Sequence, residues 1–302
     1  MLEKLGFKYL GIEDEAIFER YYKAMEKPWA SSIAFSGMIA WNHSIRTYYK
    51  EMEHFLVCIA WDVSRDSWVC LPFFGMYEQE SINQTFTKVK AFFELLQVPL
   101  IITDISEWMK PYYQAIPDTD WKIINDRGLC DYIYKADDFK AAMDGQKVRY
   151  DYRYFIRKYE PTLEIMSEEH REDCIQFLQQ VWCAEHSCEE CSYGCLKETA
   201  KGMFDSLQLK EANGIVVKKD GKIIAYCFVT YGMGQGIYLF KKTERGYRGI
   251  NEYLHRECYE RFLQEADIIN YTEDMDLEGL RKYKEKLAPY YLEPRYELQL
   301  KE

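Results

Sequence analysis

The stretch Gly214-Ile-Val-Val-Lys-Lys-Asp-Gly-Lys-Ile-Ile-Ala-Tyr-Cys-Phe-Val229 carries the clearest local signal in the chain. Two runs rich in β-branched and aromatic residues flank Asp220-Gly221, a dipeptide that accepts the positive φ angles of a tight hairpin turn. The pattern predicts a β-hairpin. Residues 236–241 have the composition of a third strand directly after it.

Helices and strands are expected on both sides of this hairpin. Before the hairpin, the pattern predicts a strand at 162–166 and helices at 167–182 and 195–210. After it, the pattern predicts a helix at 250–262, a strand at 267–271, a helix at 277–287 and a strand at 295–300. Residues 162–300 then have the order β-α-α-β-β-β-α-β-α-β. This order resembles the GNAT (acyl-CoA N-acyltransferase) fold.

The first half has a weaker but related pattern. Helices fit 13–25 and 82–96, and strands fit 55–60, 68–73, 100–102, 121–125 and 131–134. This order is compatible with a degenerate second copy of the same fold. We therefore predict an α+β protein of two tandem GNAT-like domains, with mixed central sheets flanked by helices. The N-terminal domain would span 1–158, and the C-terminal domain, 159–302, would hold the substrate cleft.

Composition limits the function. The chain has 302 residues, with 50 acidic and 39 basic side chains and a net charge of −11, which argues against a dedicated DNA-binding or nucleic-acid-coating protein. No run approaches the roughly 20 apolar residues of a membrane span. The first residues lack the apolar core of a signal peptide, so we expect a cytoplasmic protein.

Several stretches resemble a known family. They are Asp131-Tyr-Ile-Tyr134, Phe240-Lys-Lys-Thr243, Gly246 to Asn251, Asn270-Tyr-Thr-Glu-Asp274, Glu278-Gly-Leu-Arg-Lys-Tyr-Lys284 with Pro289 after it, and Pro294-Arg-Tyr296. The chain resembles soluble relatives of the phosphatidylglycerol lysyltransferase C-terminal domain. The resemblance implies the dual-GNAT architecture shared with Fem-type aminoacyl transferases. Lysyltransferases move an aminoacyl group from charged tRNA to a lipid headgroup.

Two stretches depart from the pattern of these relatives. They usually carry Phe-Glu-Lys where this chain has Phe240-Lys241-Lys242, and Asn-Arg-Glu-Glu-Asp-Leu-Gly where it has Asn270-Tyr-Thr-Glu-Asp-Met-Asp276, so a Glu and an Arg are lost. The loss of these two residues argues against a substrate shared with the relatives more than it argues against a shared fold.

Acyl transfer requires that the acceptor lose a proton and that the developing oxyanion find donors. Glu273 and Asp274 follow a predicted buried strand, where a carboxylate could act as general base or bind an ammonium group; the alternative is an acidic pair at a helix start. Arg281, Lys284 and Arg295 could bind an anionic substrate, or could form a solvated basic face. The resemblance favours substrate binding for Lys284 and Arg295.

The loop Thr243–Gly249 precedes the helix at 250–262. In GNAT enzymes the corresponding loop presents backbone N–H groups to the pyrophosphate of CoA. Arg245 and Arg248 supply part of such a site, but the register is irregular, and a plain helix-entry turn is the alternative. Asn251 and Asn270 lie in stretches that match the relatives, so we expect both to bind substrate.

Residues 146–159 interleave cations with aromatic side chains. This composition suits single-stranded RNA or a tRNA end, and the alternative is an amphipathic connecting helix.

Four cysteines, Cys183, Cys188, Cys191 and Cys195, lie within 13 residues. They could hold zinc, although the usual structural site has two more widely separated pairs; the alternative is a loop of reduced thiols.

The sequence thus predicts a transferase of acyl or aminoacyl groups to an amine or hydroxyl acceptor, with aminoacyl-tRNA or acyl-CoA as donor. Two alternatives stay open. One is a CoA-dependent N-acetyltransferase, and the other is a non-catalytic binding protein that keeps the fold.

Overall fold

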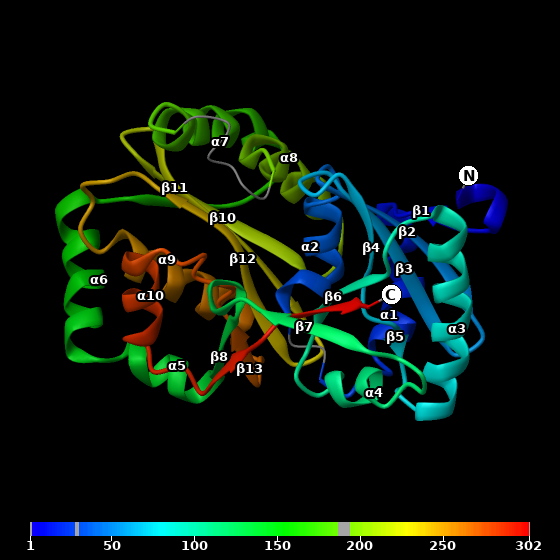
Figure 1. The fold of residues 1–302 in the computed structure, drawn as a ribbon. Helices are drawn as coiled ribbons and strands as arrows, with labels where there is room; N and C mark the ends of the chain where they lie inside the picture. Colours follow the sequence, from blue (N-terminus) through cyan, green and yellow to red (C-terminus); the bar gives the residue numbers. More distant parts are fainter. Residues whose placement is uncertain (1, 28–29, 187–193, 302) are drawn as a thin grey trace.

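The computed structural model describes residues 2–27, 30–186 and 194–301, which form two β-sheets with helices packed around them (Figure 1). The first sheet contains β1 (Lys8–Tyr9), β2 (Ile45–Met52), β3 (Phe55–Asp62), β4 (Ser67–Cys70), β5 (Phe74–Gly75), β6 (Ile101–Ile105), β7 (Trp121–Asn125) and β15 (Tyr296–Leu300). The second contains β8 (Asp131–Lys135), β9 (Thr162–Ile165), β10 (Ala212–Lys219), β11 (Lys222–Gly232), β12 (Gln235–Thr243), β13 (Ile268–Asn270) and β14 (Tyr291–Glu293).

The α-helices are α1 (Glu15–Tyr22), α2 (Phe35–Ala40), α3 (Gln79–Leu96), α4 (Lys110–Gln114), α5 (Ala136–Met143), α6 (Gln146–Tyr159), α7 (Arg171–Leu178), α8 (Leu196–Ser206), α9 (Ile250–Cys258) and α10 (Glu278–Glu285). A π-helical turn at Tyr259–Leu263 extends α9, so the long helix expected over 250–262 is present. Of the helices in the described ranges, none combines the length and the apolar character needed to cross a bilayer.

The hairpin predicted from Asp220-Gly221 is confirmed. β10 and β11 pair antiparallel up to Lys219 opposite Lys222, and Asp220 and Gly221 both have positive φ angles of 50° and 78°. These two φ values match the turn type whose twist fits a two-residue hairpin, which explains why this dipeptide fixes the register.

The two sheets exchange strands. β8 precedes the predicted boundary at 158/159, yet it lies in the second sheet between β13 and β14. β15, expected as the closing strand of the second half, instead lies in the first sheet between β6 and β7, where Leu298 is fully buried. That expectation is wrong because strand pairing depends on which sheet edge the chain reaches. The boundary itself stays a prediction, and the exchange ties the two halves together.

Helices cover both faces of the second sheet (Figure 1). On one face, α5, α6 and α9 pack over a core that includes Phe139, Phe155 and Leu254. On the other face, α7 and α8 pack over Tyr226 and Phe228 together with α2, which comes from the first half of the chain. The second sheet is therefore completed by segments from both halves.

The parallel strands β12 and β13 diverge. They pair only from Gln235–Ile268 to Ile237–Asn270, although β12 continues to Thr243. A bulge at Leu239 further interrupts the pairing of β12 with β11. Ligands of sheet proteins commonly bind beyond the carboxyl ends of parallel strands, so a ligand site is expected in the chain that follows Asn270.

Candidate active site

Residues 270–274 follow β13 and connect it to α10. We call them the 270–274 segment. Each of its five residues takes part in a hydrogen bond to another element: the strands β8 and β12 or the helices α9 and α10. Most residues that the sequence marked as candidates gather around this segment.

Asn270 anchors the start of the segment to a buried carboxylate. Its side-chain amide donates to Asp131 Oδ2 at 2.9 Å, and Asp131 also accepts from the backbone N–H and the hydroxyl of Ser31 at 2.5 and 3.0 Å. Burial raises the pKa of Asp131, and nearby Arg295 opposes the rise. Both residues are fully buried, so in this structure Asn270 holds the segment in place.

Tyr271 belongs to a polar cluster that sequence reasoning missed. Lys241 Nζ donates to Asn251 Oδ1 at 2.9 Å, to Tyr271 Oη at 2.8 Å and to His255 Nε2 at 3.0 Å. The His255 Nδ1 and Tyr283 Oη atoms lie 2.9 Å apart. We call these five residues the Lys241 cluster. Lys241 and Tyr271, the positions where the relatives' Glu and Arg are lost, therefore touch each other.

The Lys241 cluster contains a cation without an acidic partner. Among the described residues, the groups that accept from Lys241 Nζ are a neutral amide, a phenol and an imidazole. Burial lowers the pKa of Lys241 to about 8. Burial and the charges of Lys241 and Lys284 hold the pKa of His255 well below its usual value, so this histidine is neutral. A neutral imidazole that accepts at Nε2 carries its proton on Nδ1, the atom that faces Tyr283 Oη.

Only a weak sequence signal could have revealed this cluster. Asn251 and His255 are four residues apart and therefore share one face of α9, but Lys241 lies in a different element. The resemblance drew attention to Lys241 only as a departure.

Lys284 closes the segment from α10. Its side chain is 2% exposed, and Nζ donates to the carbonyl oxygens of Tyr271 and Glu273 at 2.6 and 2.5 Å. Burial lowers its pKa to about 8. Lys284 thus lies where the resemblance predicted a functional lysine, but its hydrogen bonds are to the backbone of the segment.

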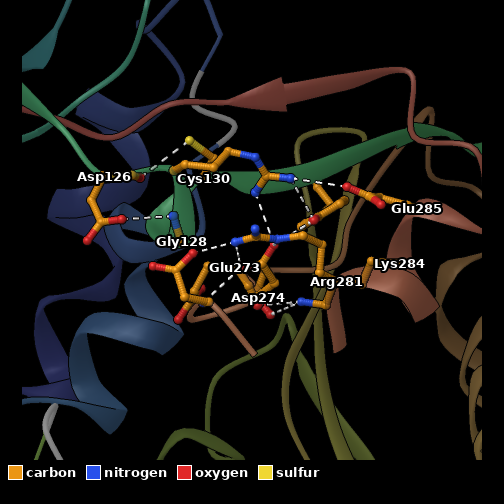
Figure 2. A network of polar contacts seen from close by, with 12 residues as sticks. Asp126, Gly128, Cys130, Glu273, Asp274, Arg281, Lys284 and Glu285 are labelled. Carbon is orange, nitrogen blue, oxygen red and sulfur yellow. Dashed lines mark hydrogen bonds and ion pairs between the residues drawn. The ribbon is translucent and has the colours of Figure 1, made fainter. Parts of the chain in front are cut away.

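Asp274 lies in a network of cationic and phenolic donors (Figure 2). Arg281 binds both carboxylate oxygens at 2.9 and 3.1 Å, and Arg127 and Tyr132 donate to Oδ2 at 3.0 and 2.6 Å. The carboxylate is fully buried, yet these hydrogen bonds hold its pKa well below the usual value. A carboxylate with this pKa and with both oxygens occupied is a poor proton acceptor at neutral pH.

Glu273 has a more open carboxylate. Its side chain is 24% exposed, and its Oε2 lies 3.6 Å from a guanidinium nitrogen of Arg295. Arg295 also donates to the Leu129 carbonyl at 2.7 Å and lies 3.8 Å from Asp104. Glu273, Lys284 and Arg295 are therefore brought together at the end of β13, next to the paired Asp274 and Arg281.

Two candidates lie away from this group. Arg245 is 81% exposed and pairs with Glu185 at 3.0 Å. Arg248 pairs with Asp151 of α6 at 2.7 Å. The backbone of α6 also approaches the start of α9, because a Cβ atom on Gly249 would lie 2.1 Å from the Asp151 carbonyl oxygen. The end of the loop at Gly249 is thus in contact with this chain's own helix α6, whereas Arg245, Gly246 and Arg248 are exposed.

The predicted zinc ligands are only partly described. Cys183 and Cys195 are exposed, and Cys188 and Cys191 lie outside the described residues. Within 2–27, 30–186 and 194–301, no group of three or more histidine, cysteine or acidic side chains is arranged to hold a metal ion.

Solved structures share this architecture. A conserved protein of unknown function from Bacteroides thetaiotaomicron is 19% identical, with 98% of this chain and 99% of that chain covered at a TM-score of 0.86. L-PGS from Bacillus licheniformis is 17% identical, with coverage of 96% and 93% and a TM-score of 0.66. A tandem GNAT protein from the clavulanic acid biosynthesis pathway is 11% identical, with coverage of 97% and 98% and a TM-score of 0.55. The expected tandem GNAT-like fold is confirmed.

The sequence comparison agrees with the shared fold. No curated protein matches the chain. The model of the family described as "Phosphatidylglycerol lysyltransferase, C-terminal" matches residues 25–298. That match spans most of the sequence and includes every stretch on which the resemblance was based. The chain belongs to the phosphatidylglycerol lysyltransferase C-terminal family.

Proposed function

We propose that this protein transfers an acyl or aminoacyl group to an amine or hydroxyl acceptor where β12 and β13 diverge. The observation that carries the proposal is the convergence of Glu273, Lys284 and Arg295 at the carboxyl end of β13. In the reaction, an acceptor nitrogen or oxygen forms a bond to the donor's carbonyl carbon. The ester oxygen of the donor leaves, and the acceptor's proton passes through the protein to it.

Glu273 is the carboxylate we assign to the acceptor. It is more open than Asp274 and lacks the close donors that occupy both oxygens of that residue. We propose that Glu273 accepts the proton or binds the acceptor's ammonium group, while Asp274 and Arg281 position the segment. Lys284 and Arg295 provide positive charge beside Glu273 and would attract an anionic donor.

We propose an aminoacyl-tRNA as the donor class in preference to acyl-CoA. The close approach of Asp151 to Gly249 leaves little room for a pyrophosphate at the start of α9. α6 also presents exposed cations, Lys147, Arg149, Arg153, Arg157 and Lys158, and the half-exposed ring of Tyr150. Cations with stacking rings suit a single-stranded tRNA end.

The first test is thermal stabilisation by candidate donors. A ligand that binds only the folded state raises the unfolding temperature. We expect mixed aminoacyl-tRNA to stabilise the protein at low salt and less at high salt, and acetyl-CoA to have no effect. Stabilisation by acetyl-CoA alone would make the protein a CoA-dependent acetyltransferase. No effect of either donor would favour the non-catalytic binding protein.

Variants separate the tRNA surface from the transfer site. Removing three cations of α6 (Arg149→Ala, Arg153→Ala and Arg157→Ala together) should reduce the slope of log affinity against log salt by about 2, since each released phosphate counterion contributes about 0.7 on a single strand. Glu273→Gln should abolish transfer of labelled amino acid and leave tRNA binding intact. Glu278→Gln, on the exposed first turn of α10, is the matched control.

A further inference from the structure

A cavity of about 220 Å³ lies outside the 270–274 segment, between α1 and the ends of β11 and β12. α1 belongs to the first half of the chain, and the two strands belong to the second sheet. The cavity therefore depends on the way in which the two halves pack. None of the residues assigned to transfer lines it.

Three carboxylates line this cavity: Glu15 and Glu19 from α1, and Glu211 at the start of β10. Lys23 pairs with Glu19 at 2.5 Å. For Glu15 and Glu211, no ion pair with a lysine or arginine is found in the described part of the chain. Burial raises the pKa of Glu211, and the charges of Glu15 and Glu19 raise it further. Two lysines, Lys23 and Lys210, also line the cavity, so its carboxylates outnumber its cations by one.

A second observation indicates a polar ligand. Thr230 lines the same cavity and is 2% exposed, and its hydroxyl has no hydrogen-bond partner in the described residues that meets the usual geometry. The hydroxyl lies close enough to Glu211 to oppose the rise in that pKa. A buried hydroxyl is seldom left without a partner, because desolvating it costs free energy.

Four aromatic residues are also part of the lining. Phe18, Tyr22, Phe35 and Tyr231 contribute rings to the lining. Aromatic faces attract cations and also pack against short aliphatic chains. With about 220 Å³ of room, the cavity can hold a small ligand of several heavy atoms.

We infer that this cavity binds the primary ammonium group of a small aliphatic amine. An ammonium has three N–H donors, which match the carboxylates of Glu15 and Glu211 and the hydroxyl of Thr230. The aromatic rings then enclose the alkyl chain. The inference concerns binding and does not depend on transferase activity, so either proposal can fail without the other.

The test is a titration of the purified protein with n-butylammonium chloride at pH 7.5 and constant ionic strength, followed by unfolding temperature and calorimetry. We expect saturable binding that 1-butanol does not reproduce. Glu211→Gln should weaken the affinity about tenfold or more, because a charge-assisted hydrogen bond is replaced by a neutral one. Glu15→Gln should also weaken it, and Glu26→Gln, on an exposed residue that does not line the cavity, should not.

Three results would overturn the inference. They are equal stabilisation by 1-butanol, which would show a merely apolar cavity; unchanged affinity in Glu211→Gln; and the absence of saturation. If Glu211→Gln does not fold, Gly232→Ala provides a second variant. A Cβ atom there would lie 2.7 Å from Glu211 Oε2 and would displace the carboxylate.

Discussion

Lys241 provides a quantitative test of the site. Its amine is enclosed by Asn251, His255 and Tyr271, and burial lowers its pKa from 10.5 to about 8. The folded protein therefore binds this proton less tightly than the unfolded chain does. Between the two pKa values the unfolded state carries more protons, so this residue makes stability rise with pH. Below pH 8, where Lys241 is charged in the folded protein, burying this charge lowers the free energy of unfolding.

The size of the effect follows from the two pKa values. At pH 7 the cost is about 3 kcal/mol, and at pH 9.5 it is about 1.4 kcal/mol, so the change over this interval is about 2 kcal/mol. Lys241→Met removes the titration and keeps a side chain of similar length. The unfolding free energy of the wild type minus that of the variant should thus rise by about 2 kcal/mol from pH 7 to 9.5.

The assay is urea unfolding followed by tryptophan fluorescence at four pH values in this range. Taking the difference between the two proteins cancels the groups that titrate in both. Lys222→Met, at the exposed turn of the β10–β11 hairpin, is the control, for which the difference should stay constant. A constant difference for Lys241→Met as well would refute the reasoning and would mean that solvent reaches the Lys241 amine.

Three further substitutions test the fold around the site. Asp274→Asn should lower the free energy of unfolding, measured in urea, by about 3 kcal/mol, because it leaves two partly exposed arginines without their buried carboxylate. A loss below about 1 kcal/mol would contradict the assigned network. Gly249→Ala should lower the melting temperature far more than Gly246→Ala. Both glycines have positive φ angles, but only at Gly249 would a Cβ atom collide with the backbone of α6. Equal losses would contradict the close approach of α6. Leu298→Ala should cost about 3 kcal/mol, measured by denaturant unfolding, because β15 lies in the interior of the first sheet, and a loss near zero would argue against that pairing.

The sequence alone determined the local elements of the second half and the family. Alternating apolar residues and the Asp220-Gly221 turn are signals carried by neighbouring residues, so the hairpin could be predicted without tertiary information. The quoted stretches also located the 270–274 segment and Lys284. The hairpin prediction is confirmed because a short segment contains the whole of the signal, and the roles of the site residues stay predictions.

Only the tertiary structure decided which residues meet. β15 pairs in the first sheet although it ends the second half, and Lys241 meets His255 and Tyr271 from three different elements. Likewise, arginines from two other parts of the chain enclose the carboxylate of Asp274, whereas the carboxylate of its neighbour Glu273 is more open. Contacts between residues far apart in the chain, and the burial that shifts their pKa values, depend on the packing of whole elements. Spacing along the sequence does not encode them.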